Sequence, residues 1–259
     1  MPANGSPDFT DKVVIVTGSS AGIGYEIARE FGAAGARIVV NSRSDARAQE
    51  AAGALKSAGI EAIGVAADVS DYAQAQRLVD ETAATLGGVD ILVNNAGISM
   101  IAKSEELDPA DWQRAINTNL SGPFFCSRAA APAMFARGGG VILNIGSAAG
   151  AVGLPMRAAY CAAKHGLEGL TKVLALDWAK HGVRVVCIDP AFIKTAMDER
   201  DSATAGYTDE LVERRTPAGR IGRVSDVATV ALFLASPGAS YITGSSILVD
   251  GGWVAYGYL

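Results

Sequence analysis

Residues 12–24 read KVVIVTGSSAGIG, which places an apolar run directly before a glycine-rich turn. The β-branched residues of the run predict a buried strand, and the residues from about 22 to 34 predict a helix. Gly18, Gly22 and Gly24 allow a tight turn in which backbone N–H groups approach an anion, and the following helix directs its positive dipole end toward it. The spacing is GxxxGxG rather than the GxGxxG common in dinucleotide-binding folds, but the same physics applies. A strand, a glycine-rich turn and a helix in this order predict an α/β fold with a phosphate-binding turn.

The rest of the chain repeats this alternation of apolar strands and helical stretches. Further strands are expected at 36–42, 61–68, 89–97, 139–147, 183–190 and 245–252. Further helices are expected at 45–59, 71–86, 108–137 with a break near Pro123, 158–181 and 225–235. Strands that are apolar on both faces and separated by helices are typical of a parallel sheet covered on both sides. We therefore predict a single domain over residues 1–259, a Rossmann-type doubly wound α/β fold with a seven-stranded parallel sheet and helices on both faces.

A polar segment over residues 194–216 interrupts this alternation just after the sixth expected strand. Long polar insertions at the carboxyl end of a strand commonly cover a ligand site. We predict that this segment is a substrate lid, and a pair of solvated surface helices is the alternative.

Composition limits the partners that the protein can have. The net charge is −5 and no run of basic residues occurs, so a nucleic acid is not expected as a partner. The start of the chain is polar and no apolar segment is long enough to cross a bilayer, so neither a signal peptide nor a membrane is expected. Cys126, Cys161 and Cys187 are scattered without a CxxC motif, which favours reduced thiols in a cytoplasmic protein. The histidines are His165 and His181 alone, and no metal site is expected.

The end of the second expected strand, VVNSRSDAR at residues 39–47, bears on which dinucleotide the turn binds. An acidic residue at this place accepts hydrogen bonds from the ribose hydroxyls of NAD and would repel a 2′-phosphate. Here Ser42 stands where the acid is expected and Arg43 follows it, and a serine with a guanidinium group binds a phosphate. We therefore predict NADP(H) rather than NAD(H); the alternative is a solvent-facing Arg43 that pairs with Asp45. Asp68, which follows the third strand, is expected at the adenine edge.

Several motifs occur together in one order along the chain. They are TGSSAGIG at 17–24, NNAG at 94–97, Asn119 in NTNLSG, Ser147 in NIGSAAG, and Tyr160 and Lys164 in YCAAK. In this order and spacing the chain closely resembles the classical short-chain dehydrogenase/reductase family, from residue 11 to about residue 253. YxxxK alone would occur often by chance, whereas the whole ordered set is specific.

The resemblance implies a role for each of four side chains. Tyr160 would be the general acid/base that gives a proton to a substrate carbonyl oxygen or takes it back, and Ser147 would hold that oxygen by a hydrogen bond. Lys164 would bind the nicotinamide ribose, and its positive charge one helical turn from Tyr160 would favour the phenolate. Asn119 would hold a water molecule that links Lys164 to solvent.

The glycine-rich turn and the resemblance together imply the cofactor contacts. They are Gly18, Ser20, Gly22, Ile23, Gly24, Ser42, Arg43, Asp68, Val69, Asn95, Ala96, Gly97, Tyr160, Lys164, Pro190, Ile193 and Thr195. Residues 190–195, PAFIKT, are similar to the family's PGxxxT segment, but Ala191 replaces its glycine. Because alanine adopts a positive φ poorly, this turn is expected to differ slightly. Asn94 and Asn95 are also expected to bind backbone groups of neighbouring strands.

The resemblance implies a carbonyl reductase, which interconverts a ketone and a secondary alcohol, and the residues at the end of the second strand predict that it uses NADP(H). The walls of its substrate site are expected at 98–100, 148–157, Phe192 and Met197, mostly apolar residues that suit a small or medium cyclic ketone, keto-sugar or 3-oxoacyl compound. Arg157 would face either an acidic substrate or solvent. The alternatives are a non-catalytic NADP(H)-binding sensor on the same fold, and a sugar epimerase or dehydratase, whose chains are usually longer.

The end of the chain bears on assembly. The resemblance implies a homotetramer, or a homodimer, with contacts built by the last helix and strand. The tail VAYGYL at 254–259 is expected to pack on a neighbouring subunit, because a disordered end would not usually be so rich in apolar and aromatic residues.

Overall fold

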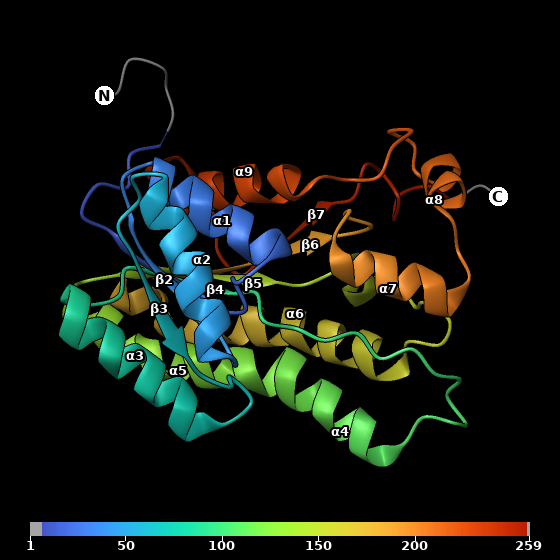
Figure 1. The fold of residues 1–259 in the computed structure, drawn as a ribbon, viewed down its shortest axis with the longest axis horizontal. Coiled ribbons are helices and arrows are strands. Elements are labelled where there is room, and N and C mark those ends of the chain that lie inside the picture. Colours follow the sequence, from blue (N-terminus) through green and yellow to red (C-terminus); the bar gives the residue numbers. More distant parts are fainter. Residues whose placement is uncertain (1–6, 258–259) are drawn as a thin grey trace.

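The computed structural model describes residues 7–257, and its centre is a seven-stranded sheet in the order β3-β2-β1-β4-β5-β6-β7 (Figure 1). The strands are β1 (Val13–Val16), β2 (Arg37–Ser42), β3 (Ala62–Ala66), β4 (Ile91–Asn94), β5 (Gly140–Ile145), β6 (Val183–Pro190) and β7 (Ser246–Val249). Every neighbouring pair is parallel. The chain first builds outward to β3 and then returns to place β4 beside β1. In doubly wound sheets, ligands bind at the carboxyl ends of the strands where the order reverses in this way.

Helices cover both faces of the sheet (Figure 1). One layer holds α1 (Gly22–Ala33), α2 (Asp45–Ser57) and α9 (Val224–Ala235), and the other holds α3 (Tyr72–Leu86), α5 (Gly122–Ala136) and α6 (Ala158–Trp178). The side chains of β1 alternate between them: Val14 and Val16 pack in the first apolar cluster, and Val13 and Ile15 in the second. All four are fully buried. The predicted Rossmann-type α/β fold is confirmed.

The predicted helix over 108–137 is divided into three parts. α4 (Pro109–Ile116) runs into a π-helical turn, η1 (Asn117–Ser121), before α5 begins at Gly122. Pro123 lacks a backbone N–H and therefore stands in the first turn of α5, where that group would have no partner within the helix. The break predicted near Pro123 is thus confirmed, and the wide turn just before it contains the buried Asn119.

The polar segment 194–216 forms two short helices, α7 (Ala196–Ala205) and α8 (Asp209–Arg215), beyond the carboxyl end of β6 (Figure 1). Each helix begins after a threonine that caps it. Thr195 Oγ1 accepts the N–H of Asp198 at 3.2 Å, and Thr208 Oγ1 accepts the N–H of Leu211 at 3.4 Å. Local capping therefore starts α7 directly beside the end of the sheet where a ligand site is expected.

The C-terminal tail packs on its own chain as far as it is described. Arg215 of α8 lies over the ring of Trp253 at 4.9 Å and over the ring of Tyr256 at 5.1 Å. Arg215 Nη1 also donates to the backbone oxygen of Trp253 at 3.0 Å. These contacts occupy part of the tail for which contacts with a neighbouring subunit are predicted, and residues 258–259 lie outside the described part.

Composition led to expectations about the cysteines, membrane spans and metal sites. All three cysteines are free thiols. Within residues 7–257, no helix combines the length and the apolar character that crossing a bilayer requires. In the same part of the chain, no group of three or more His, Cys, Asp or Glu side chains could hold a metal ion.

Candidate active site

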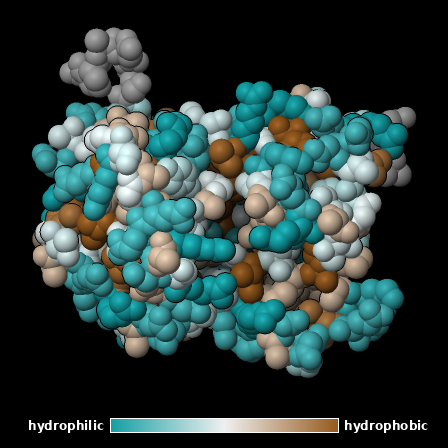
Figure 2. Space-filling model, in the orientation of Figure 1, coloured by the Kyte–Doolittle hydropathy of each residue, from teal (hydrophilic) through white to brown (hydrophobic). Residues whose placement is uncertain are grey.

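A cavity of about 890 Å³ opens at the carboxyl ends of the strands, where the strand order reverses. Figure 2 shows the face of the molecule hollowed between α1 and α7. Every residue predicted to bind the cofactor or to act in catalysis lines the cavity, except Gly24. At Gly24 a Cβ would collide with the amide of Asn95, so close packing requires a glycine there, and its contact with a cofactor stays a prediction. The predicted site residues, which are spread along the chain between Gly18 and Thr195, thus meet in one cavity.

The glycine-rich turn forms the wall at one end of the cavity. Gly18 and Gly22 have φ angles of +62° and +61°, which residues with a Cβ rarely adopt. A Cβ on Gly18 would also lie 2.8 Å from the Cα of Ala96. α1 begins after Ala21, which offers no capping side chain, so the first-turn N–H groups of α1 remain available to a ligand. A close backbone approach beside an uncapped helix N-terminus fits the pyrophosphate of a dinucleotide.

Polar side chains hold this turn from behind. Ser19 Oγ accepts the N–H of Asn41 at 3.1 Å, and Asn41 Oδ1 accepts the N–H of Gly18 at 3.2 Å. Asn95 Nδ2 donates to the carbonyl oxygen of Gly18 at 3.1 Å, while Asn94 Nδ2 donates to side chains of β5 and α5. The turn is therefore tied to β2 and to the end of β4. Asn95 binds backbone groups as predicted, whereas Asn94 binds mainly side chains.

A second end of the cavity carries two cations. Ser42, Arg43 and Arg47 all line it, and both arginines are exposed to the cavity mouth. Asp45 accepts a hydrogen bond from Gln49 at 3.3 Å and makes no ion pair with Arg43 among the described residues. The sequence analysis missed Arg47, although its position four residues after Arg43 at the start of an expected helix was a usable signal. Two guanidinium groups beside a serine hydroxyl fit the 2′-phosphate of NADP(H).

α6 and the end of β5 bring three predicted catalytic side chains together. Tyr160 and Lys164 lie one turn apart on α6, and Lys164 Nζ is 5.5 Å from the centre of the Tyr160 ring. Lys164 is buried, and its Nζ donates to the carbonyl oxygen of Ile145 at 2.7 Å, which fixes the ammonium group beside the ring. Ser147 Oγ accepts the N–H of Ala149 at 3.1 Å, so its own proton is free to be donated into the cavity.

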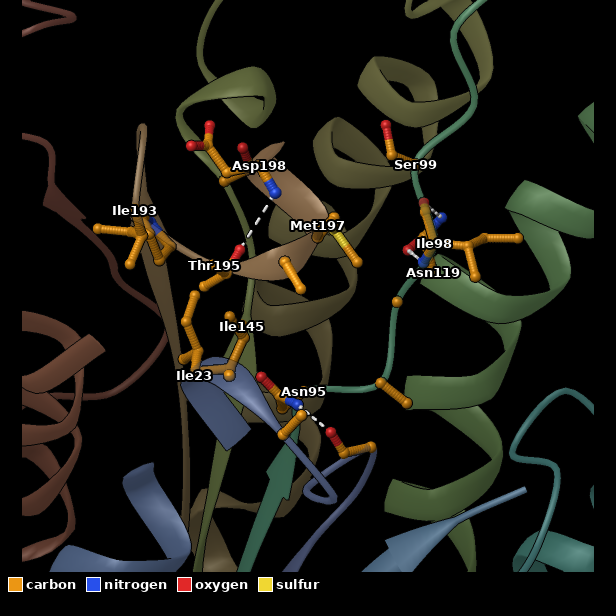
Figure 3. A pocket seen from close by; sticks show the side chains of 18 of the residues that line it. Ile23, Asn95, Ile98, Ser99, Asn119, Ile145, Ile193, Thr195, Met197 and Asp198 are labelled. Carbon is orange, nitrogen blue, oxygen red and sulfur yellow. Dashed lines mark hydrogen bonds between the residues drawn. The ribbon is translucent and has the colours of Figure 1, made fainter. Parts of the chain in front are cut away.

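Asn119, the fourth predicted catalytic residue, joins two segments of the cavity wall. Its Oδ1 accepts the N–H of Ile98 at 3.0 Å, and its Nδ2 donates to the carbonyl oxygen of Ile98 at 2.9 Å (Figure 3). Its Nδ2 also donates to the carbonyl oxygen of Ala115 at 3.0 Å. Both amide protons are therefore used within the protein. A water molecule can therefore bind this side chain only by donating a hydrogen bond to Oδ1, and Oδ1 is the atom that would hold the predicted water.

Asp189 of β6 is a buried carboxyl group that the sequence analysis did not single out. It is 1% exposed, and its Oδ1 accepts the N–H of Ser147 and the thiol of Cys187, both at 3.1 Å. Burial raises the pKa of Asp189, while those two hydrogen bonds and the charge of Lys164 act in the opposite direction. Gly146 is needed here because a Cβ would collide with the carboxylate. Asp189 thus holds the backbone of Ser147, and a lone acid in the apolar strand VRVVCIDP was the available signal.

α7 and the loop after β4 line the remaining part of the cavity. Figure 3 shows Asp198 of α7 across the cavity from Ile98 and Ser99 of that loop. Phe192 and Met197, which are predicted for the substrate walls, line the cavity as well. This part of the cavity therefore combines apolar side chains with the acidic side chains of α7.

Arg157 lies at the N-terminus of α6. The sequence predicted that it faces either an acidic substrate or solvent. It is buried, and its Nη1 donates to Asp201 Oδ2 at 2.7 Å and to Ser99 Oγ at 2.8 Å. The acid that it meets therefore belongs to the protein itself. The contact joins α7 to α6 and to the loop after β4 across the cavity.

Comparisons with known proteins place these observations in context. A family model described as enoyl-(acyl carrier protein) reductase matches residues 18–254. The chain is 41% identical over 251 residues to 3beta-hydroxysteroid dehydrogenase 1 of Eggerthella lenta, covering 96% of each chain. It is 38% identical over 242 residues to D-threitol dehydrogenase of Mycolicibacterium smegmatis, covering 93% of this chain and 92% of that one. Among solved structures, a gluconate 5-dehydrogenase of Burkholderia cenocepacia in complex with NADP and tartrate matches with a TM-score of 0.92 and 35% identity, covering 96% of this chain and 97% of the other.

Proposed function

The chain belongs to the short-chain dehydrogenase/reductase family, and from this premise we propose that it interconverts a ketone and a secondary alcohol with NADP(H), using Tyr160 as general acid/base. It is an oxidoreductase that acts on CH–OH groups with a nicotinamide dinucleotide. The proposal rests on one observation above all. Tyr160, Ser147 and Lys164 meet in the same cavity whose glycine-rich end fits a dinucleotide.

The proposed chemistry divides between the cofactor and the protein. The dinucleotide, when bound, supplies or accepts the hydride. Ser147 Oγ donates a hydrogen bond to the substrate oxygen and holds it before Tyr160, whose hydroxyl gives its proton to that oxygen in reduction and takes it back in oxidation. Lys164, fixed by its 2.7 Å bond to Ile145, keeps a positive charge near the ring and stabilises the phenolate that remains when the proton leaves.

The preference for NADP(H) rests on the cations at the end of β2. Arg43 and Arg47 would bind the 2′-phosphate, the turn at Gly18 would hold the pyrophosphate, and Ile193 and Thr195 would contact the nicotinamide carboxamide. Thr195 Oγ1 accepts the N–H that caps α7, so its proton remains available for that contact. The gluconate 5-dehydrogenase of Burkholderia cenocepacia binds NADP on the same fold, which supports the preference.

We extend the proposal to the lid predicted over 194–216. α7 lines the cavity, and its Asp201 is joined to Arg157 of α6 at 2.7 Å. A short helix that an ion pair joins to the opposite wall can open when that pair breaks and admit a substrate. The proposed substrate is a small or medium carbonyl compound or the corresponding alcohol.

The homotetramer is proposed on the apolar side chains that the single chain leaves exposed. Leu176 of α6 is 79% exposed, and Val173, one turn before it, is exposed as well. Apolar patches of this kind mark subunit contacts. Light scattering after size-exclusion chromatography should give four times the mass of one chain, and a monomer would contradict the proposal. A cytoplasmic location remains a prediction.

A panel assay tests the proposed function. Purified protein is incubated with NADPH or NADH and a cyclic ketone, a keto-sugar, a 3-oxoacyl thioester and an enoyl thioester, while the absorbance of the reduced nicotinamide is followed. We expect turnover of at least one carbonyl compound and faster turnover with NADPH. Clear cofactor binding without turnover of any carbonyl or alcohol would instead favour the non-catalytic sensor.

A further inference from the structure

The substrate part of the cavity carries polar side chains that the proposed reaction does not use. We name them the hydroxyl wall: Ser99, Arg157, Asp198, Asp201 and Tyr207, all of which line the cavity. They come from the loop after β4, the start of α6, helix α7 and the residues just after α7. Polar groups of this number in a buried site need partners, either from the protein or from a ligand.

The charge of Arg157 is already balanced within the wall. Its side chain is 9% exposed and that of Asp201 is 16% exposed, and the two are 2.7 Å apart. Because both groups are largely withdrawn from water, breaking this pair would leave an uncompensated buried charge. An anionic substrate group would have to displace Asp201 from Arg157 before it could use the guanidinium.

Asp198 presents the opposite situation, a carboxylate oxygen without a partner. The residue is 8% exposed, and its Oδ1 accepts the hydroxyl of Tyr207 at 3.0 Å. Its Oδ2 is buried and has no hydrogen-bond partner among residues 7–257. The nearby ammonium group of Lys194 is bound to Asp209 instead, at 2.7 Å. A shielded carboxylate oxygen of this kind is stabilised when a ligand donates a hydrogen bond to it.

The charges that face Asp198 also exclude some ligands. Burial raises the pKa of Asp198, and the carboxylates of Asp209 and Asp201 act in the same direction, against the hydrogen bond from Tyr207 and the charge of Lys194. Within the wall, two carboxylates face one guanidinium group. A further carboxylate brought by a substrate would meet net repulsion, whereas a neutral hydroxyl can donate to an oxygen and accept from Ser99 or Arg157.

From this wall we infer that the substrate is a neutral polyhydroxylated alcohol, or the keto-sugar formed from it, and that Asp198 selects it by accepting a hydrogen bond from one of its hydroxyl groups. The inference rests on the proposed function, because it takes Tyr160 as the reacting end of the cavity. The inferred role of Asp198 restricts the proposed substrates from carbonyl compounds in general to keto-sugars and the polyhydroxylated alcohols that form them. It excludes aldonate-type acids and plain hydrocarbon ketones as preferred substrates.

The test compares three alcohols of four carbons with NADP⁺: threitol, threonate and 2-butanol. We expect kcat/KM for threitol to exceed that for each of the other two by about tenfold or more, as one hydrogen bond to a charged group predicts. In D198N the ratio of kcat/KM for threitol to that for 2-butanol should fall about tenfold, mainly through KM. The control E213Q removes an exposed acid of the same segment that does not line the cavity, and it should leave the ratio unchanged.

The outcomes separate this inference from the proposed function. A wild-type enzyme that prefers threonate or 2-butanol, or a D198N variant with an unchanged ratio, would overturn the inference while the proposed reaction stands. Calorimetry of threitol binding to the NADP⁺-loaded protein covers the case in which no alcohol is oxidised. Binding that D198N weakens and E213Q does not would then support the wall, and equal binding by the wild type and D198N would overturn it. NADPH fluorescence confirms that each variant retains its cofactor site.

Discussion

At the cofactor end of the cavity Gly18 and Gly22 shape the backbone itself, whereas at the substrate end charged side chains from separate elements meet. The two glycines have φ angles of +62° and +61° and lie four residues apart. Arg157 meets Ser99 and Asp201, which are 58 and 44 positions away from it in the chain. A backbone shape is set locally and tolerates few substitutions. An ion pair between elements can be exchanged for other side chains without altering the sheet, so specificity can change at that end alone.

Tyr160 lies where the two ends meet, and its removal should produce the largest effect. Tyr160→Phe removes only the hydroxyl proton, so kcat should fall by about 10²–10⁴-fold, the usual contribution of a general acid/base. The affinity for NADPH, measured by fluorescence, should change little because the ring and Lys164 remain. Full activity in this variant would contradict the proposed mechanism.

The rigidity of the cofactor end can be tested at Gly18. A Cβ there would lie 2.8 Å from the Cα of Ala96 at a φ of +62°. Gly18→Ala should therefore weaken NADPH binding by about 100-fold, the effect of roughly 2–3 kcal/mol of strain and displacement. Fluorescence titration with NADPH measures the affinity.

Gly59→Ala is the matched control for this variant. Gly59 has a φ of +82°, and a Cβ there would meet nothing within 4 Å. This variant should lose about 1–2 kcal/mol of unfolding free energy through strain alone and bind NADPH normally. If Gly18→Ala also binds NADPH normally, the close approach of the turn to Ala96 has no role in binding.

Replacing Arg43 at the cofactor end should weaken NADPH binding less than Gly18→Ala does, and it should spare NADH. Arg43→Ala should weaken NADPH binding by about tenfold, as expected for one exposed charge-assisted hydrogen bond, and leave NADH binding unchanged. The loss should shrink at high salt, because the pair is screened. Lys56→Ala removes a cation of α2 outside the cavity and serves as the control. An equal loss of NADPH and NADH affinity in Arg43→Ala would argue against contact with the 2′-phosphate.

The smallest effect is expected behind the catalytic wall, at Asp189. Burial raises the pKa of Asp189, so the folded protein holds that proton more tightly than the unfolded chain. Stability should therefore fall as pH rises from the ordinary carboxyl range through the raised pKa. In Asp189→Asn, Tm should fall less over this pH range than in the wild type. Each kcal/mol of unfolding free energy that Asp189 loses on ionisation corresponds to about 2–4 °C of Tm. Thermal melts between pH 4 and about pH 8 measure it, and parallel curves for both proteins would show that the burial of this carboxyl group does not influence stability.

Much of the fold and of the cofactor end was predictable from the residues themselves. The strand before Gly18 is apolar on both faces, and its side chains alternate between two helical layers as that pattern requires. The break before Pro123 also followed from local chemistry, because proline has no N–H to continue a helix. The close approach of Gly24 to Asn95 was not predictable, because glycine spacing does not distinguish an approach to a ligand from an approach to another side chain.

The sequence alone determined that this chain alternates strands and helices, turns tightly at Gly18 and presents Tyr160 and Lys164 on one face of a helix. These features depend on neighbours within a few residues, where periodicity and backbone preference act. Only the tertiary structure decided that Arg157 is neutralised by Asp201, that Asp198 Oδ2 is left without a partner among residues 7–257, and that Asp189 holds Ser147. Each of these depends on burial and on a distance between distant parts of the chain. The sequence does not show whether an acidic residue faces water or a cavity. Its role depends on its burial and its partners in the folded chain.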